Sequence, residues 1–313
     1  MAKRPQVTVL GSLNMDISVT VPRLPPPGAT VLGSAATFTP GGKGANQAVA
    51  AARLGAQARM AGCVGDDDFG RRLLDALRKE GVDVEKVRVA SGVPTGLAMI
   101  SVDRAGENLI TVAPGANHEV AEPDVTAAVS GPRDVLVISA EIPVPAIRLA
   151  LARARGTRCV LNLAPASAEA VAIVADGVDW LVVNESEAGA ILGQPVDGLA
   201  DARPAAAGLV AAGARHAVVT AGAHGVAIAG RGTDLDEVFS FPAFRVKAVD
   251  TVGAGDTFVG ALAVALAAGV PAPEAVRAAA AAGATAATRP GAQVGMPRPA
   301  DILAATGLTW PVA

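Results

Sequence analysis

The sequence Val7-Thr8-Val9-Leu10, which ends at Gly11, is a short run of apolar and β-branched residues. Four further runs of four or five residues share this character: Val135 to Ile138, Cys159 to Leu163, Trp180 to Val183 and Ala217 to Thr220. Continuous apolarity of this length is typical of strands that are buried on both faces of a sheet. The runs therefore predict a central sheet inside the protein.

Between these runs lie longer, Ala-rich segments with a helical pattern: Ala45 to Leu54, Phe69 to Glu80, Pro145 to Arg155, Ala202 to Ala212 and Thr257 to Ala268. Strands that alternate with helices favour a mainly parallel sheet with helices on both sides. We predict an α/β fold that forms one domain over residues 1–313.

Four predicted strands lack intervening helices: Ile17 to Val21, Thr30 to Phe38, Thr95 to Val102 and Asn108 to Val112. They predict a small antiparallel sheet that projects from the main domain as a lid, built from segments of about 15–40 and 94–113. One apolar face of such a sheet needs a partner, so we expect it to cover a site or form a dimer contact.

The composition is that of a globular protein. Hydrophobic residues make up 51% and charged residues 18% of the 313 residues, and the formal net charge is -3. Without clustered cations, and with 3% aromatic residues, the chain is unsuited to nucleic acid. The two cysteines, Cys63 and Cys159, have apolar neighbours and are expected to be buried and inert.

Neither the N-terminal segment nor the longest apolar run is expected to enter a membrane. Met1 to Leu10 is too polar and short for a signal peptide, and the apolar stretch from Thr257 to Pro273 is broken by glycine and proline. These features predict a cytoplasmic protein without a membrane span. Thr306 to Ala313 is predicted to be a loose tail.

The segment Asp250-Thr251-Val252-Gly253-Ala254-Gly255-Asp256-Thr257-Phe258 opens the last of the predicted helices. Two glycines let the backbone approach a ligand, and free N–H groups at a helix start can hold phosphate oxygens. Asp256 is placed to accept a proton from an attacking hydroxyl, as phosphoryl transfer requires. The alternative is that Asp256 is only a helix N-cap. The chain has neither a Walker A loop nor a GxGxxG motif.

Two N-terminal segments supply candidate ligands for a polyol. Asn14 and Asp16 alternate along an extended segment and point to one side, which suits a vicinal diol, although a side-chain-stabilised turn explains them equally well. Pro40 to Gln47 is rich in glycine and offers Lys43 and Asn46 as donors. Its alternative is a flexible loop with a solvated lysine.

Further polar residues follow predicted strands, where ligands bind in open α/β sheets. Glu141 follows one strand, and Asn184-Glu185-Ser186-Glu187 follows another. Asn184 and Glu187 can face phosphate and hydrated Mg²⁺, and they also match a capping box. Thr220 to Gly225 leaves a third strand as a candidate nucleotide loop.

Taken together, these segments resemble the ribokinase group of the phosphofructokinase-B type carbohydrate kinases over nearly the whole chain. The residues that carry the resemblance are Gly11 to Asp16, Gly41 to Ala48, Asn184 to Glu187, Asp250 to Phe258 and Thr288 to Gln293. The resemblance implies a ribokinase-like fold and a homodimer formed through the lid. It also implies transfer of the γ-phosphoryl group of ATP to the 5-hydroxyl of D-ribose, giving ribose 5-phosphate.

The resemblance also implies roles for individual residues. Asp256 would be the general base, beside an anion hole of Gly253, Ala254 and Gly255. The sugar would be held by Asn14, Asp16, Gly42, Lys43, Asn46, Glu141 and Asp256. ATP would meet Asn184, Thr220, Ala221, Gly222, Ala223, His224, Gly225 and Gly255, with Glu187 supporting Mg²⁺ through water. A K⁺ ion would be held by Asp250, Val252, Ala286, Arg289, Gly291 and Gly295.

Two positions depart from the family pattern. Gly295 stands where some members offer a serine hydroxyl to K⁺, which bears on the strength of K⁺ activation. Ala280 replaces a polar residue often found near adenine, which bears on nucleotide selectivity.

Two alternative functions remain open at this point. A sibling kinase of another pentose or a nucleoside would share Asp256 but differ around Asn14. A sugar sensor without activity would use the same pocket, although the intact Asp256 argues against it.

Overall fold

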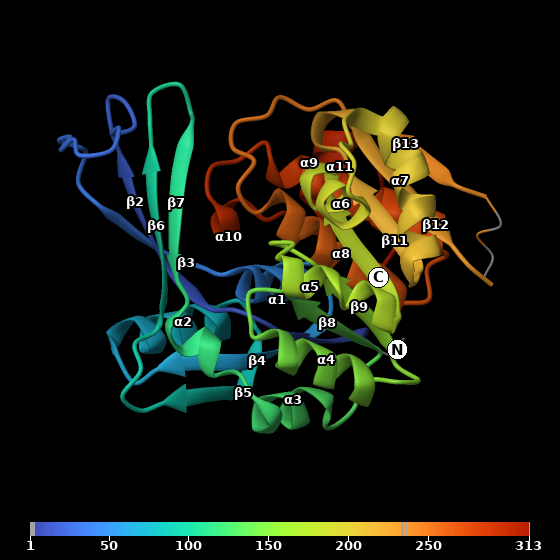
Figure 1. Ribbon diagram of the computed structural model, residues 1–313, viewed down its shortest axis with the longest axis horizontal. Coiled ribbons are helices and arrows are strands. Elements are labelled where there is room, and N and C mark those ends of the chain that lie inside the picture. The colour runs from blue at the N-terminus through green and yellow to red at the C-terminus, as the bar shows by residue number, and fades with distance from the viewer. Residues whose placement is uncertain (1–3, 233–234, 236, 313) are drawn as a thin grey trace.

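The computed structural model describes residues 4–232, 235 and 237–312. Its main feature is a nine-stranded sheet in the order β13-β12-β11-β10-β9-β8-β1-β4-β5, flanked by helices (Figure 1). The strands are β1 (Gln6–Leu10), β4 (Gln57–Gly65), β5 (Asp83–Ala90), β8 (Val135–Ser139), β9 (Arg158–Asn162), β10 (Val178–Asn184), β11 (Ala214–Thr220), β12 (Gly225–Gly230) and β13 (Phe239–Pro242). The pairs from β5 to β11 are parallel, and β12 and β13 are antiparallel additions at one edge.

Helices cover both faces of this sheet, and each face has its own hydrophobic core. One core contains Val7, Val9, Val135 and Val137 and is covered by α1 (Lys43–Arg53), α2 (Asp68–Lys79), α8 (Ala254–Ala267), α9 (Ala272–Ala286) and α11 (Pro299–Thr306). The other contains Leu10, Leu136 and Ile138 and is covered by α3 (Glu122–Val129), α4 (Val144–Arg153), α5 (Ala168–Val171), α6 (Glu185–Leu192) and α7 (Gly198–Ala212). Neighbouring residues of each strand thus enter opposite cores. This arrangement confirms the predicted α/β fold.

The remaining helical turns are short. They are the 3-10 turns η1 (Gly115–Glu119), η2 (Val174–Asp176) and η3 (Gly222–His224), and the four-residue helix α10 (Ala292–Gly295).

The five strands predicted from apolar runs are all present. Four others, β4, β5, β12 and β13, were not predicted. Strand β4 begins with Gln57 and Arg59 and contains two glycines, so its sequence lacks a continuous apolar run. Strand β5 carries charged residues along most of its length because it forms the edge of the sheet. Edge strands commonly carry charges, which discourage pairing with other chains.

A second sheet of four strands stands apart from the first, in the order β3-β2-β6-β7 (Figure 1). We call it the small sheet, and it comprises β2 (Asn14–Thr20), β3 (Thr37–Gly41), β6 (Gly96–Val102) and β7 (Asn108–Ala113). The prediction of a purely antiparallel sheet was wrong, because β2 and β6 pair in parallel. Helices α1 and α2 and strands β4 and β5 separate these two strands in the chain, so no hairpin joins them.

The predicted strand from Thr30 to Phe38 was also largely wrong. Only its last two residues belong to a strand, β3, which continues to Gly41. Residues 32–36 contain Gly33, Ser34, Ala35 and Ala36, which provide little apolar surface to bury in a sheet. They form a loop in which the Ser34 N–H donates to the Thr20 carbonyl.

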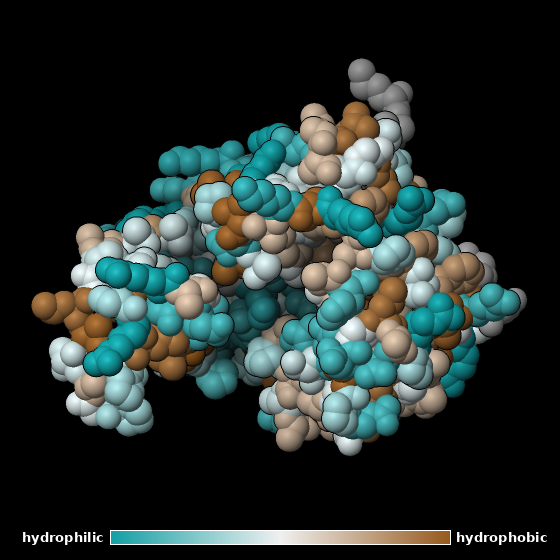
Figure 2. Space-filling model, turned by 90° about the horizontal axis from the view of Figure 1, so that it is seen from above, coloured by the Kyte–Doolittle hydropathy of each residue, from teal (hydrophilic) through white to brown (hydrophobic). Residues whose placement is uncertain are grey.

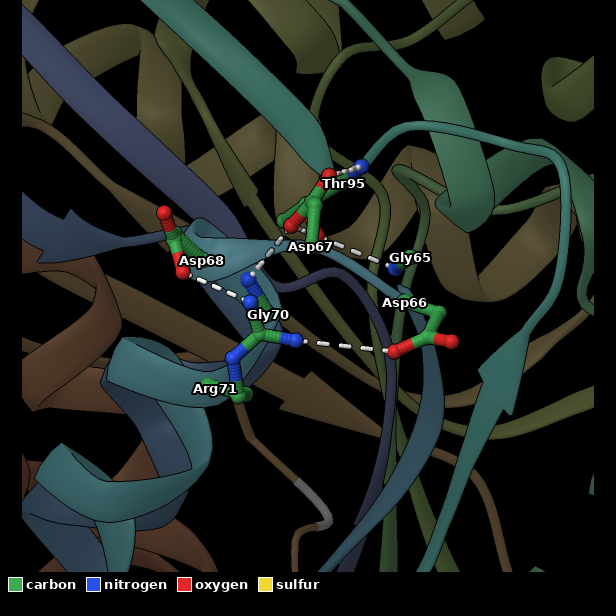
Figure 3. A network of polar contacts seen from close by, with 7 residues as sticks. All are labelled: Gly65, Asp66, Asp67, Asp68, Gly70, Arg71 and Thr95. Carbon is green, nitrogen blue, oxygen red and sulfur yellow. Dashed lines mark hydrogen bonds and ion pairs between the residues drawn. The ribbon is translucent and has the colours of Figure 1, made fainter.

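The small sheet is fastened to the main domain by Asp67 (Figure 3). Its carboxylate caps α2 by accepting the Gly70 N–H at 2.8 Å, and it accepts the Thr95 hydroxyl at 2.6 Å and the Thr95 N–H at 2.8 Å. Thr95 precedes β6, and its hydroxyl accepts the Gly65 N–H at the end of β4. One side chain thus joins β4, α2 and the start of β6.

The C-terminal segment is anchored, so the prediction of a loose tail was wrong. Trp310 is 6% exposed, and its indole N–H donates to the Leu54 carbonyl at 3.0 Å. Residue 313 lies outside the described part of the chain, as do residues 1–3 of the predicted polar N-terminus.

The expectation that the cysteines are buried agrees with the structure. Both cysteines are buried, and burial raises the pKa of the Cys159 thiol to about 12, which leaves it protonated and unreactive. No helix within residues 4–232 or 237–312 is long and apolar enough to cross a membrane.

Candidate active site

Most of the candidate residues meet where the parallel strands end, at the edge that faces the small sheet. Asp256 lies in the first turn of α8 and is 8% exposed. Its carboxylate accepts the side-chain amide of Asn46 at 2.8 Å and that of Gln47 at 3.3 Å. Helix α8 is capped by Gly253, so the interpretation of Asp256 as an N-cap was wrong. The carboxylate points at α1 rather than at its own helix.

Charges of both signs surround Asp256. Burial raises the pKa of the Asp256 carboxyl, while the Lys43 ammonium and the Asn46 and Gln47 amides lower it. In turn, the Asp256 carboxylate is the main cause that raises the pKa of Lys43. The lysine predicted to bind the sugar is therefore positively charged and close to the predicted base.

Glu141 joins two of the predicted segments. Its Oε2 accepts the Ser12 hydroxyl at 2.5 Å and the Lys43 backbone N–H at 3.2 Å. Ser12 follows β1, and Lys43 begins α1. A single carboxylate therefore fixes the loop after β1 against the glycine-rich entry to α1.

The entry to α1 depends on Gly42, which has a φ of 88°. A Cβ built on Gly42 would lie 2.6 Å from the Asn14 nitrogen, so only glycine brings this backbone against β2. The prediction of a flexible loop with a solvated lysine is thereby excluded, because the segment is closely packed and Lys43 is only partly exposed.

Asn14 and Asp16 lie on one face of β2, and neither belongs to a turn. Asn14 is 3% exposed, and its Oδ1 accepts the Asn117 side-chain amide at 2.7 Å. Burial, with smaller contributions from the charges of Glu141 and Asp256, raises the pKa of Asp16 to about 7. The side-by-side amide and carboxylate expected from the sequence are thus present in the fold.

Asp16 lines a cavity of about 740 Å³ between the small sheet and the segments 248–252 and 290–294. Figure 2 looks from above into a hollow with a hydrophilic floor between the small sheet and the rest of the molecule. A larger cavity of about 1040 Å³ lies elsewhere, at the amino ends of β9, β10 and β11, and none of the candidate residues line it. Asp16 lines the smaller cavity together with Asp250, Val252 and Gly291 of the candidate cation site, whereas Asn14, Lys43, Asn46, Glu141 and Asp256 do not line it.

The candidate nucleotide residues end two neighbouring strands. Asn184 of β10 and Thr220 of β11 are register partners at the carboxyl ends. Residues 221–225 form a tight turn in which the Ala221 N–H donates to the Gly225 carbonyl. Gly222, Ala223 and His224 are exposed in this turn, and the His224 ring lies 3.9 Å from the Glu185 carboxylate.

The capping box predicted at α6 is present. The Asn184 side chain accepts the Glu187 N–H at 2.9 Å, and the Glu187 carboxylate accepts the Asn184 N–H at 2.8 Å. Burial raises the pKa of Glu187, and Lys43 lowers it while Asp256 raises it. Glu187 therefore lies within the electrostatic reach of both residues, so capping and a role in the site are compatible.

The candidate anion hole is formed by the start of α8. Gly253 has a φ of 77°, and a Cβ there would lie 2.9 Å from the Ala292 Cα, so the turn requires glycine. Gly255 is exposed, and a Cβ there would meet no atom within 4 Å. The Ala254 N–H donates to the Thr251 carbonyl at 3.2 Å, and the exposed Gly255 leaves the first turn of the helix open to an anion.

Some of the candidate cation ligands are brought together by Asp250 and others lie around Gly295. Asp250 accepts the Val252 N–H at 3.0 Å with Oδ1 and the Gly291 N–H at 2.8 Å with Oδ2. A Cβ built on Gly295 would lie 3.3 to 3.5 Å from the carbonyl oxygens of Ala286, Arg289 and Pro290. Several carbonyl oxygens around one small residue are a donor set suited to a hard cation.

Four residues of the site were not assigned roles from the sequence. They are Ser12, Gln47, Asn117 and Gln293, which bond to Glu141, Asp256, Asn14 and Asn46 respectively. Ser12, Gln47 and Gln293 stand inside motifs that carry the family resemblance, which was the available signal. Asn117 lies in η1, far from any motif, and nothing in its local sequence marks it.

The α/β fold, with a buried carboxylate at the start of α8, is that expected of a carbohydrate kinase, and a family comparison agrees with this class. Residues 4–299 match the pfkB family of carbohydrate kinases, and this chain belongs to that family.

Individual relatives narrow the comparison. The chain is 37% identical to a ribokinase of Haemophilus influenzae over 94% of this chain and 96% of the relative. It is 34% identical to a deoxyribokinase of Salmonella typhimurium over 82% and 84%. The structure of Arabidopsis thaliana ribokinase complexed with ribose and ATP is similar with a TM-score of 0.84 and 30% identity, covering 98% of this chain and all of that one (100%).

Proposed function

We propose that this protein is an ATP-dependent kinase that phosphorylates the 5-hydroxyl of D-ribose and forms ribose 5-phosphate. The observation that carries the proposal is the buried Asp256 carboxylate, which is held by Asn46 and Gln47 at the start of α8. Lys43, Glu141 and Asp16 lie within electrostatic reach of this carboxylate. The choice of ribose as the acceptor rests on the relatives that are named ribokinases.

In this proposal, Asp256 accepts the proton of the 5-hydroxyl while that oxygen forms a bond to the γ-phosphorus of ATP. The bond between the γ-phosphorus and the bridging oxygen breaks, and ADP leaves. Gly253, Ala254 and Gly255 donate N–H groups to the transferred phosphoryl group as its charge shifts. Lys43, with its raised pKa, keeps a positive charge beside the reaction.

The sugar is assigned to the region around Asp256, Lys43 and Glu141, next to the cavity that Asp16 lines under the small sheet. Asn14, Asp16, Gly42, Lys43, Asn46 and Glu141 hold its hydroxyl groups. Asp16 and Asn14 can each contact a hydroxyl of a vicinal pair, because they share a face of β2. The small sheet then acts as the lid over the sugar.

ATP is assigned to the carboxyl ends of β10 and β11, with contacts from Asn184, Thr220, Gly225, Gly255 and the turn 221–224. Mg²⁺ would neutralise charge on the phosphates, and Glu187 would hold the ion through a water molecule bound to it. K⁺ would be held by Asp250, Val252, Ala286, Arg289, Gly291 and Gly295, where carbonyl oxygens converge. The need for ATP supports the predicted cytoplasmic location.

The experiment is a coupled assay of ADP release with D-ribose, 2-deoxyribose and nucleosides as acceptors. We expect the highest kcat/KM with ribose. Turnover of a nucleoside without turnover of ribose would overturn the proposal. If the protein binds ribose but forms no ADP from ATP with any pentose as acceptor, it is a sensor.

A second candidate is 2-deoxyribose, because a deoxyribokinase is 34% identical to this chain. The two sugars differ at one hydroxyl, so the same assay separates them. A site that hydrogen-bonds the 2-hydroxyl rejects a sugar that lacks it.

A further inference from the structure

Gln293 lies between the candidate cation loop and the candidate base. Gln293 is part of α10 and is 8% exposed. Its side-chain N–H donates to the Asn46 Oδ1 at 3.1 Å. The Asn46 amide N–H in turn donates to the Asp256 Oδ2 at 2.8 Å. The three side chains form a directed chain of hydrogen bonds that ends on the carboxylate.

The direction of this chain matters because an amide can present either end. Asn46 helps the Asp256 carboxylate only when its NH₂ group faces it, since an ionised carboxylate accepts but cannot donate. The donor from Gln293 holds the Asn46 oxygen away from Asp256 and so selects this orientation. Asn46 is 5% exposed, which leaves little room for water to replace Gln293.

The side-chain amide of Gln47 also reaches Asp256, but it is a weaker donor to the carboxylate than Asn46. The Gln47 side-chain N–H donor is shared between Asn162 Oδ1 at 3.0 Å and Asp256 Oδ1 at 3.3 Å. The shorter bond goes to Asn162. Asn46 is therefore the closer donor to the carboxylate, and its orientation depends on Gln293.

Gln293 is itself held in place by α1. Arg53, seven residues after Asn46, donates through one nitrogen to the carbonyl oxygens of Gln293 at 2.6 Å and Met296 at 2.7 Å. Its other nitrogens form a two-pronged pair with Glu80 at 2.8 and 2.7 Å. Helix α1 thus grips α10 at two points, and α10 includes Gly295 of the cation loop.

We propose that Gln293 is a positioning residue that acts on Asp256 through Asn46 and joins the cation loop to the base. The inference rests on the proposed kinase function. Charged groups also face Asp256 from other elements, namely Lys43 of α1, Glu141 after β8, Asp16 of β2 and Glu187 of α6. None of these is changed by a substitution at Gln293, so their influence is the same in every variant.

The test is the pH dependence of kcat in two variants of the whole enzyme. Gln293→Met removes the donor with similar volume, and we expect kcat with ribose to fall about tenfold at neutral pH. The acid limb of the profile should move up by about one pH unit, because a carboxylate that loses an oriented donor binds its proton more tightly. The KM for ATP should stay unchanged.

Gln293→Glu sharpens the test. Its carboxylate accepts from Asn46 and turns the Asn46 oxygen toward Asp256, so we expect a larger loss of kcat than in Gln293→Met. Because Gln293→Glu keeps a polar side chain of similar size, it can be used to test the proposal even if Gln293→Met does not fold. Gln57→Met is the matched control, since Gln57 pairs with Gln6 in an exposed amide contact at the amino ends of β4 and β1, the ends opposite to the candidate site.

The outcomes separate the two proposals. If the wild type is active and both Gln293 variants keep its pH profile and kcat, the role of Gln293 is refuted. A lower kcat without movement of the acid limb indicates a purely structural role and also refutes it. If the wild type releases no ADP with any sugar, it is the proposed function that fails.

Discussion

The Asp256 carboxylate is buried, and it accepts hydrogen bonds from Asn46 and Gln47 that favour its charged form. Burial raises its pKa, whereas Lys43, Asn46 and Gln47 lower it. Burial is the larger influence, so the pKa of Asp256 lies above its ordinary value, which favours uptake of a proton.

Replacing Asp256 by asparagine should therefore remove the base and leave the cavity. We expect Asp256→Asn to lower kcat by at least ~10²-fold, because the loss of a general base acts on the transition state. Sugar binding, measured by calorimetry without ATP, should remain within a few-fold of the wild type. A variant with near-normal kcat would exclude the base role.

Asp16 should link stability to pH. Its pKa is raised to about 7 in the folded protein from an ordinary 3.8, so folding is penalised as the pH rises between these values. Asp16→Asn should raise the free energy of unfolding at pH 8 by roughly 1–2 kcal/mol and have little effect at pH 4. Denaturant unfolding at both pH values tests this, and an equal gain at both would contradict it.

The same substitution should weaken the site. Asparagine has an NH₂ donor in place of one of the two acceptor oxygens, so it cannot accept from two hydroxyl groups through two separate oxygens as a carboxylate can. We expect the KM for ribose to rise as stability at pH 8 improves.

At the scale of elements, Asp67 determines how β4, α2 and β6 are joined (Figure 3). Three hydrogen bonds reach its carboxylate from Gly70 and Thr95. Burial raises its pKa, but these bonds and the charge of Arg71 lower it below its ordinary value overall.

Asp67→Ala should lower the free energy of unfolding by roughly 2 kcal/mol at pH 7, because it removes a helix cap and the anchor of β6. Since the folded pKa is lowered, this contribution is present above pH 4 and is lost as the pH falls through the folded pKa. Asp68→Ala is the control, because Asp68 forms only an exposed ion pair with Arg71. Equal losses in both variants would contradict the anchoring role.

Residues 250–252 and 286–295, which we propose to hold a cation, form a second junction between elements. The Asp250 carboxylate connects the segment before α8 to Gly291, so its charge and its two acceptor oxygens both matter. We expect the wild-type rate to be higher in K⁺ than in a large organic cation such as tetramethylammonium. Asp250→Asn should lose most of that difference. Equal wild-type rates in K⁺, Na⁺ and tetramethylammonium would count against a cation site.

At the scale of the whole molecule, the small sheet leaves apolar side chains uncovered. Met99, Leu109, Ile110 and Val112 are each about half exposed, and Figure 2 shows brown surface gathered on this part of the protein. Ile110 and Val112 lie on the same face as Asp16, which lines the cavity of about 740 Å³, whereas Met99 and Leu109 lie on the other face. Pairing of two copies through this face would cover apolar surface and help to enclose the sugar.

We therefore predict a homodimer formed through the small sheet. Ile110→Lys should shift the protein toward the monomer in sedimentation equilibrium. Leu303→Lys, at a similarly exposed leucine on α11, should leave the assembly unchanged. A wild type that is monomeric at all concentrations tested would refute this prediction.

The sequence by itself determined the central strands, the alternation with helices and the main parts of the site. Strands buried on both faces are continuously apolar, so Val135 to Ile138 can be recognised locally. Gly253 and Gly42 mark turns that no other residue can form, and such marks are also local. The edge strand β5 and the glycine-containing β4 lack these signals, which is why they were missed.

Only the tertiary structure decided which of these segments meet. The parallel pairing of β2 with β6 joins residues separated by two helices and two strands of the main domain. The contact of Asn117 with Asn14 spans 103 residues, and that of Gln293 with Asn46 spans 247. Hydrogen bonds between such distant residues depend on the packing of whole elements, so no local pattern reveals them. The same packing made Asp256 an acceptor for α1 rather than the cap of its own helix.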